Sequence, residues 1–336
     1  MTKKKFGAAF CAAAVLSVAL AFTSCGRDTG VTVIRVADIW SSSHPMARGV
    51  SEIFAPMIEA QTDGAIRVEV FHYGQLGNEQ SLWDSVRSGA IDAVVVGTVM
   101  NSEYTPMLIA DWPFLYRDLY HAKNVWTGSF AEQFKGDFNA FFPEVVMLSV
   151  GPNSARTFTS NLPLTSFADF QGQRIRMPAN PIHTGIATDL GASAQIIPLS
   201  ELFTALQTGV VDGQDNGMVT VLSERFNEVQ AYLFETNHIV ATMHIIMNSG
   251  ALSRLNPEYQ EIIRNAANAA AAFAWDEYIL SGDINRQTLR DAGVIVTVPT
   301  PEDQQLLVNA VQPTIERLYA ENAWARELTE RVRNVQ

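Results

Sequence analysis

Cysteine is almost absent from this sequence, which contains only Cys11 and Cys25. Cys11 lies inside an uncharged, mainly apolar run, residues 6–22, that follows three lysines and is typical of a secretory signal peptide. Removal of that segment would leave Cys25 alone, so the mature chain could form no internal disulfide. The scarcity of cysteine therefore excludes a fold held together by disulfides.

The motifs of the common catalytic and cofactor sites are also missing. The six histidines lie far apart, and there is no His-Glu-x-x-His or Cys-x-x-Cys pattern for a metal. There is no Gly-x-Ser-x-Gly elbow, no phosphate-binding loop and no dinucleotide-binding glycine pattern. We therefore expect no enzyme activity, no cofactor and no metal site.

Long hydrophobic runs are lacking after the N-terminal segment. A helix that crosses a membrane needs roughly 20 uninterrupted apolar residues. The alanine-rich stretch 266–274 is too short and contains Asn268. We expect no membrane-spanning segment in the body of the chain.

Positive charge is in short supply. The chain has 23 basic and 35 acidic residues, a formal net charge of −12, and loss of the three leading lysines would bring it to about −15. This excess argues against nucleic acid and anionic membrane surfaces as partners. After Cys25 only Lys123 and Lys135 are lysines, and the arginines that replace them suit bidentate binding of carboxylates. Genomic compositional bias is the alternative explanation for most of these arginines.

The N-terminal segment ends at a cysteine. Thr23 and Ser24 precede Cys25, and small residues just before a cysteine resemble a lipobox, although Phe22 stands where that motif usually has leucine. We predict that residues 1–24 form a lipoprotein-type signal peptide and that Cys25 carries the lipid. An ordinary signal peptide with cleavage nearby is the alternative.

The stretch 171–216 holds the most informative pattern of the chain. Residues 174–177 alternate arginine with apolar side chains and are followed by Pro178, which predicts a short strand, and residues 181–190 have helical spacing. A strand followed by a loop and a helix presents a side chain at the carboxyl end of the strand, where α/β proteins bind ligands. Arg176 occupies that position.

A second pattern is an internal echo. Residues 82–92 (LWDSVRSGAID) and 202–212 (LFTALQTGVVD) each predict a helix, a glycine stop and a strand, with Gly89 and Gly209 placed as helix C-caps. Chance recurrence of a common junction is one explanation, and two equivalent α/β lobes are the other. A remaining length of about 310 residues favours two lobes.

The spacing of apolar residues predicts the other elements. We expect strands at 32–38, 66–71, 91–97 and 145–151, helices at 45–61 and 78–88, a crossing to the second lobe near Pro152, and a return to the first lobe at 236–248. Residues 256–291 predict one long helix, or two helices broken near Gly282. A final helix is expected from Pro301 onward.

The sequence resembles the solute receptors of TRAP transporters, the DctP family. Arg-Ile-Arg-Met-Pro, Leu-Gly-Ala and the run from Glu201 to Asn216 (ELFTALQTGVVDGQDN) follow that family's order, and weaker likeness extends over residues 33–292. The resemblance implies an α/β, two-lobed, periplasmic-binding-protein-like clamshell with a long interlobe helix. We assign residues 25–151 and about 237–278 to lobe one, and residues 152–236 and about 279–336 to lobe two.

The same resemblance implies the ligand-binding residues. Arg176 matches the arginine that pairs with the substrate carboxylate in this family, and Arg156 matches a second arginine that often reaches the ligand. Asn216 matches an asparagine of the cleft wall, although Gly217 follows where the family usually has proline. From lobe one we expect Trp40, Tyr73 and Gln75 to line the cleft.

These observations predict an extracytoplasmic, lipid-anchored receptor that captures a carboxylate and passes it to the membrane permease of a TRAP transporter. Two alternatives remain: an interaction or apolar-ligand-binding lipoprotein on the same fold, and a receptor for an ATP-driven importer. The identity of the acid does not follow from the sequence.

Overall fold

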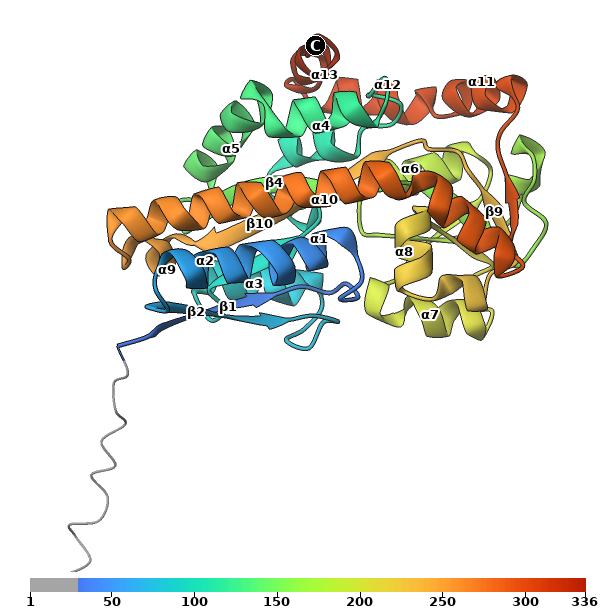
Figure 1. Cartoon of the computed structure of the whole chain (residues 1–336). Helices are drawn as coiled ribbons and strands as arrows, with labels where there is room; N and C mark the ends of the chain where they lie inside the picture. The colour runs from blue at the N-terminus through green and yellow to red at the C-terminus, as the bar shows by residue number, and fades with distance from the viewer. Residues whose placement is uncertain (1–29) are drawn as a thin grey trace, which may run out of the picture.

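The structure is a computed structural model that describes residues 30–336. Two β-sheets, each covered by helices, lie at opposite ends of an elongated molecule and are joined along its length by one long helix (Figure 1). We call each sheet with the helices packed on it the first and the second lobe. The predicted signal peptide and the lipid site at Cys25 lie outside the described residues.

The first lobe is built on a five-stranded sheet in the order β2-β1-β3-β10-β4. Strands β1, β2 and β3 are parallel, whereas β10 runs antiparallel to both β3 and β4. Because β10 returns from the second lobe to the middle of this sheet, the predicted return strand at 236–248 is confirmed. The strands are β1 (Thr32–Ala37), β2 (Ile66–Phe71), β3 (Ala93–Val96), β4 (Val145–Ala155) and β10 (Val240–Asn248).

The helices of the first lobe cover the two faces of that sheet. The segment expected as a helix at 45–61 is helical throughout, but its middle six residues form a π-helix. The elements are α1 (Pro45–Arg48), η1 (Gly49–Phe54), α2 (Ala55–Gln61), α3 (Glu79–Ser88), η2 (Val99–Ser102), η3 (Thr105–Asp111), α4 (Leu119–Thr127), α5 (Ser129–Phe141) and α9 (Ser249–Ser253).

The second lobe is built on a six-stranded mixed sheet in the order β11-β9-β5-β8-β6-β7. Its strands are β5 (Thr157–Ser160), β6 (Arg174–Met177), β7 (Ser193–Ile196), β8 (Gly213–Asn216), β9 (Tyr232–Phe234) and β11 (Ile295–Thr297). Its helices are η4 (Phe167–Phe170), α6 (Pro181–Asp189), α7 (Leu199–Gln207), α8 (Met218–Ser223) and η5 (Phe226–Glu228). The predicted strand at 174–177 and the helix after it are confirmed.

The echoed segments are equivalent in the structure. Helices α3 and α7 each end at a glycine with a left-handed backbone, at φ +77° for Gly89 and +69° for Gly209, and each is followed by a strand that pairs in parallel with its neighbour. A left-handed residue costs little only when it is glycine. The sequence repeat therefore marks the same helix-to-strand junction in the two lobes.

The chain passes between the lobes at Arg156. Strand β4 stays in the first sheet up to Ala155, which pairs with Val240, and β5 begins in the second sheet at Thr157. We expected the crossing near Pro152, and the structure places it four residues later, at Arg156. Arg156 is fixed by the backbone at the joint between the two sheets.

Helix α10 (Pro257–Asp291) runs unbroken for 35 residues. Asn256 caps its start by accepting a hydrogen bond from the Tyr259 amide at 2.8 Å, and the helix passes through Gly282 without a break. An alanine face packs closely on the first lobe, because a Cβ atom at Gly49 would lie 2.7 Å from the Ala270 carbonyl oxygen. This helix braces both lobes (Figure 1).

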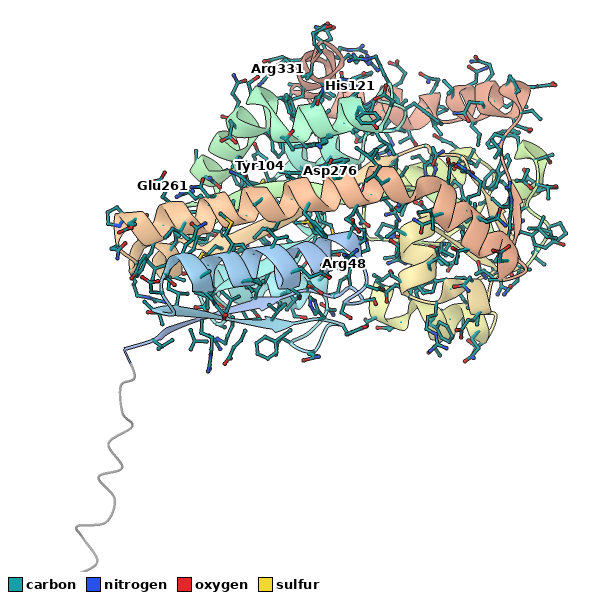
Figure 2. The ribbon with its side chains drawn as sticks, in the orientation of Figure 1. Arg48, Tyr104, His121, Glu261, Asp276 and Arg331 are labelled. Carbon is teal, nitrogen blue, oxygen red and sulfur yellow. The ribbon has the colours of Figure 1, made fainter. Side chains whose placement is uncertain are left out.

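The expectation of a single final helix from Pro301 is wrong. The segment forms α11 (Pro301–Ala310), α12 (Gln312–Glu321) and α13 (Ala325–Arg333), because Pro313 favours a new helix start and the chain turns again after Asn322. Helix α13 lies on the first lobe, where His121 Nε2 is 3.0 Å from the Val332 oxygen and Arg331 donates to Gln133 at 2.6 Å (Figure 2). We expected residues 279–336 to belong to lobe two, but α13 contacts the first lobe.

No helix within residues 30–336 is long and apolar enough to cross a membrane.

Candidate ligand-binding site

A cavity of about 230 Å³ lies between the two lobes. Four of the six predicted ligand-binding residues line it: Trp40 from the first lobe, Arg176 and Asn216 from the second, and Arg156 at the crossing. Apolar side chains share the wall with amides, hydroxyls and charged groups. A buried cavity with a few convergent polar groups has the usual character of a small-molecule site.

Arg176 is the penultimate residue of β6 and is only 4 % exposed. Its Nε donates to the Ile197 carbonyl oxygen at 2.7 Å, which fixes the side chain, and within residues 30–336 the structure contains no ion pair for its guanidinium. Burial, followed by the neighbouring charge of Arg156, lowers the pKa of Arg176 to about 9. A buried cation without a carboxylate partner is costly, and an anion in the cavity would relieve that cost.

Arg156 lines the same cavity but already has a protein partner. Its Nε donates to Asp215 Oδ1 at 2.8 Å, and its Nη2 donates to the Asp215 carbonyl oxygen. Burial opposes ionisation of Asp215, but the charges of Arg156 and His238 outweigh it and hold the pKa of Asp215 well below its usual value. Arg156 is therefore a rigidly held second positive charge beside Arg176.

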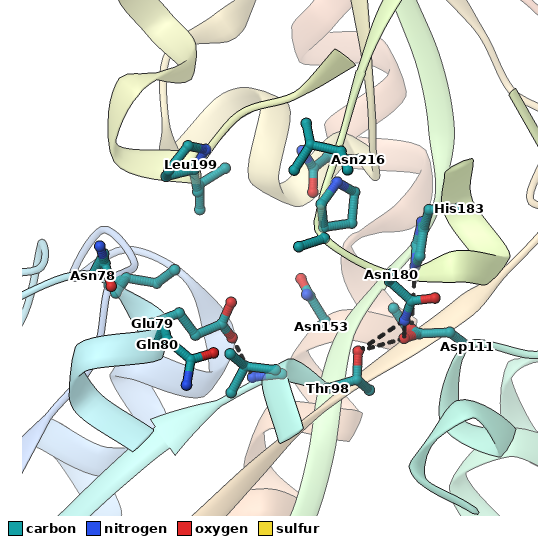
Figure 3. Close-up of a pocket in the computed structure, with 18 of the residues that line it drawn as sticks. Asn78, Glu79, Gln80, Thr98, Asp111, Asn153, Asn180, His183, Leu199 and Asn216 are labelled. Atoms are coloured by element: carbon teal, nitrogen blue, oxygen red, sulfur yellow. Dashed lines mark hydrogen bonds and ion pairs between the residues drawn. The ribbon is translucent and has the colours of Figure 1, made fainter. Parts of the chain in front are cut away.

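A buried network joins the two lobes on one side of the cavity. His183 Nδ1 lies 2.7 Å from Asp215 Oδ2, and its Nε2 lies 3.6 Å from Asp111 Oδ1. Asn180, which caps α6, donates to Asp111 Oδ2 at 2.8 Å (Figure 3). Asp111 belongs to the first lobe and the other three residues to the second, so these contacts hold the lobes together around the cavity.

The pKa of His183 is shifted by this network. Burial and the charge of Arg156 lower its pKa, but the hydrogen bonds with Asp111 and Asp215 and the charge of Asp111 outweigh them, so the pKa of His183 is raised. The pKa of Asp111 is lowered: burial raises it, but the hydrogen bond and charge of His183 and the hydroxyl of Thr98 have the larger combined effect. The cavity wall therefore contains ionisable groups of both signs, Asp111 and His183, in addition to the two arginines.

Asn216 ends β8, and its amide donates to Gln214 Oε1 at 2.6 Å. Gly217 follows, and the structure explains why this chain has glycine there. A Cβ atom at position 217 would lie 2.4 Å from both the Ala155 oxygen and the Ser154 Cβ. The amide of Gly217 also donates to Ser154 Oγ at 3.1 Å, a hydrogen bond that proline could not make.

Trp40 is 4 % exposed and lies on the first-lobe wall of the cavity. The neighbouring His44 caps α1 through a 3.2 Å hydrogen bond from the Met46 amide and does not line the cavity. Trp40 thus contributes an apolar surface to the site.

Tyr73 and Gln75 are not among the residues that line the cavity, which corrects the prediction that they do. The turn after β2 is fixed by His72, which lies 2.7 Å from Asp38 through Nδ1 and 2.7 Å from Ser51 through Nε2. Tyr73 has φ +59°, is 58 % exposed, and its hydroxyl lies 3.0 Å from Ser42 Oγ. The Tyr73 hydroxyl is thus engaged by the serines near Trp40, and Gln75 is exposed.

The sequence did not indicate several polar residues of the site, among them Glu79, Asp111, Asn180 and His183. Asn180 had a local signal, since asparagine before proline at a helix start is a typical cap. The others depend on partners distant in the chain and had no such signal. Within residues 30–336 there is no cluster of three or more His, Cys, Asp or Glu side chains that could hold a metal ion.

The comparisons with known proteins agree with this geometry. The model of the family described as bacterial extracellular solute-binding protein, family 7 (DctP) matches residues 36–322. A solute-binding protein of Roseobacter denitrificans is 32% identical over 222 residues, which are 66% of this chain and 67% of that protein.

Solved structures are similar over almost the whole chain. A TRAP periplasmic solute-binding protein of Haemophilus influenzae with bound L-gulonate has a TM-score of 0.86 at 26% identity, covering 91% of this chain and 100% of that one. The sugar acid-binding protein DctPAm of Advenella mimigardefordensis, in complex with galactonate, has a TM-score of 0.85 at 26% identity, covering 91% and 97%.

Proposed function

The chain belongs to family 7 of the bacterial extracellular solute-binding proteins, the DctP family, and from that premise we propose that it captures an organic acid between its lobes and delivers it to a TRAP-type permease. One observation carries the proposal. Arg176 is buried in the interlobe cavity, fixed through Nε and without an ion pair among the described residues. The carboxylates bound by the similar structures support an acid as the ligand.

Arg176 would provide the main charge interaction. A hydrogen bond to a charged group contributes roughly 1.5–3 kcal/mol, and loss of one partner of a buried pair costs about 2–5 kcal/mol. Arg156, whose direction is set by Asp215, adds positive charge without moving. Ligand binding would then need little rearrangement of the two arginines, which lowers its entropic cost.

These arginines also resolve a charge problem. The chain has a formal net charge of −12, which at long range repels an anion. Charges inside a cleft with low-dielectric walls act strongly on a ligand at short range. The anion is therefore recognised by the local field of Arg176 and Arg156 and not by the protein as a whole.

Binding would be coupled to closure of the lobes. Besides the Asp111 contacts, the Ser41 amide of the first lobe donates to Glu224 Oε1 of the second at 2.8 Å. Two of the segments that connect the lobes are short, one at Arg156 and one between β9 and β10. A ligand that bridges the lobes adds to the contacts of the closed form and shifts the population toward it.

We place the protein outside the cytoplasm, as its family membership supports. Lipid attachment at Cys25 remains part of this proposal and rests on the sequence before that cysteine alone. Metabolic labelling of expressed protein with a fatty acid analogue tests it. Loss of label in Cys25→Ala is the expected result, and an unlabelled wild-type protein would contradict it.

A thermal-shift screen of the purified protein against a library of carboxylates tests the main proposal. We expect at least one acid to raise the Tm, and Arg176→Ala to abolish that rise. Arg174→Ala is the matched control, because Arg174 lies two residues away on the same strand but pairs with Asp212 outside the cavity. If no acid shifts the Tm, the function proposed here is wrong.

A further inference from the structure

The first lobe contributes two carboxylates to the cavity wall, those of Asp111 and Glu79. Asp111 is already engaged by Thr98, Asn180 and His183, whereas Glu79 has an oxygen that is free of contacts with the described residues. This residue opens α3, directly after the cap residue Asn78, and lines the same cavity as Arg176. Its Oε1 accepts a hydrogen bond from the Gly97 amide at 2.5 Å. The carboxylate is therefore held in a fixed position on the first-lobe wall.

Glycine at position 97 leaves room for the Glu79 carboxylate. A Cβ atom at Gly97 would lie only 3.1 Å from Glu79 Oε1, so a larger residue at position 97 would crowd the carboxylate. Glycine removes that conflict and leaves its amide free to donate. Two segments of the first lobe, the start of α3 and the end of β3, thus combine to hold one acid group at the cavity.

The second oxygen of Glu79 remains available. Within residues 30–336 the structure contains no hydrogen bond to Oε2, and Figure 3 shows that this oxygen is turned toward the space between the lobes. Arg176 has the opposite character, because its terminal nitrogens are donors without an ion-pair partner among the described residues. The cavity therefore has an open cationic donor in the second lobe and an open anionic acceptor in the first.

A complementary ligand has an acceptor anion at one end and a hydrogen-bond donor at the other. A second carboxylate at the far end would face Glu79, and an unfavourable pairing of like charges costs on the order of several kcal/mol. Apart from Asp111, whose carboxylate is paired with His183 and Asn180, the polar groups near Glu79 on that wall are neutral, among them Asn78, Gln80 and Thr98. Neutral amides and hydroxyls suit a hydroxylated chain, whose groups both donate and accept.

We infer that Glu79 is a specificity-determining residue that selects hydroxylated monocarboxylates and rejects the dicarboxylates of the same carbon skeleton. This inference rests on the proposed function, since it takes the carboxylate end of the ligand to lie at Arg176. Glu79 accepts a hydrogen bond from a hydroxyl at the distal end of the acid. The same carboxylate excludes an acid group at that end.

Isothermal titration with matched acid pairs tests this inference. Galactonate and galactarate share one skeleton and differ at the terminal carbon, as do gluconate and glucarate. We expect the wild-type protein to bind the better monocarboxylate of these pairs at least about 100-fold more tightly than its dicarboxylate, a difference of about 2.7 kcal/mol. Glu79→Gln should reduce that ratio by at least tenfold, mainly by improved binding of the dicarboxylate.

Two further variants separate the possible outcomes. Glu69→Gln removes the same charge from a partly exposed position on β2 of the same lobe that does not line the cavity, and it should leave the ratio unchanged. Arg176→Ala should abolish binding of all four acids. A ratio near one in the wild-type protein, or an unchanged ratio in folded Glu79→Gln, would overturn the role of Glu79 while leaving the proposed function intact. Absence of binding by every carboxylate, including those of the wider screen, would overturn both.

Discussion

His183 lies between two carboxylates that belong to different lobes. Its Nδ1 is 2.7 Å from Asp215 Oδ2, and its Nε2 is 3.6 Å from Asp111 Oδ1. Asp215 is in turn held by Arg156 at the crossing between the sheets. The lobe contact, the crossing and the cavity wall are therefore parts of one buried charge network.

Asp111→Asn should weaken ligand binding. The substitution removes the charge that His183 and Asn180 contact across the interface, and hydrogen bonds to charged groups contribute roughly 1.5–3 kcal/mol each. We expect the Kd of the best acid to rise by about tenfold or more in titration calorimetry, with little change in which acid is preferred. Asp84→Asn, on the exposed side of α3, is the control, and an unchanged Kd for Asp111→Asn would contradict the role of this contact.

The stability of the protein should depend on pH through His183. Its pKa is raised above the ordinary value of 6.5 in the folded state, so the stability that its proton contributes is complete below that value and is lost as the pH rises through the raised pKa. The free energy of unfolding should therefore fall above pH 6.5, and His183→Gln should remove that part of the dependence. Urea titrations of both proteins between pH 6 and 9 measure the difference, and parallel curves would be inconsistent with a charged His183.

The contribution of Glu79 to the free energy of unfolding should also fall as the pH rises, starting from pH 4.5. Burial raises its pKa from the ordinary value of 4.5 and Asp111 adds to this, while the Gly97 amide, Arg176 and Arg156 act in the opposite direction. The stabilising contribution is complete below pH 4.5 and is lost as the pH rises through the raised value. Without ligand, Glu79→Gln should gain stability relative to wild type from pH 4.5 toward neutrality. Thermal unfolding across that range tests this, and a constant difference would contradict it.

Gly217→Ala should destabilise the protein and impair binding. The new Cβ would lie 2.4 Å from the Ala155 oxygen and the Ser154 Cβ, and overpacking of this kind costs typically 1–3 kcal/mol. Gly136→Ala is a matched control, because nothing lies within 4 Å of the added Cβ and alanine in a helix is favoured by about 0.5–1 kcal/mol. We expect the two variants to move the Tm in opposite directions. A Tm for Gly217→Ala equal to that of wild type would show that the neighbouring strand can yield.

Much of the fold followed from local signals. The alternation at 174–177, the cap before Pro257 and the glycine stops at positions 89 and 209 depend on neighbours within a few residues, and the structure has the predicted strand, helix and turns at each place. The single helix predicted from Pro301 was wrong because Pro313 favours a new helix start, and the chain then turns again after Asn322 so that α13 packs on the first lobe. The spacing of apolar residues after Pro301 did not indicate the contact of α13 with the first lobe.

The site was predictable only in part. Arg176, Arg156, Asn216 and Trp40 were selected from strand ends and from the family resemblance, and the structure places all four at the cavity; their contacts with a ligand stay predictions. Tyr73 and Gln75 were selected by the same reasoning, but both are exposed and neither lines the cavity. A strand end indicates where a loop begins and not where its side chains point.

The sequence by itself determined the local strands and helices and the arginine that the proposed function rests on, because each depends on short-range patterning or on a motif continuous in the chain. It favoured two lobes but left open a chance repeat, and it left open a break in the long helix at Gly282; the structure decided both questions. Only the tertiary structure decided what surrounds that arginine. Glu79 lies 97 positions before Arg176, and Asp111 is 69 positions from Asn180. Charges so distant in sequence act on one another only when folding excludes water between them, since the energy of a buried pair depends on distance in space and on local polarity.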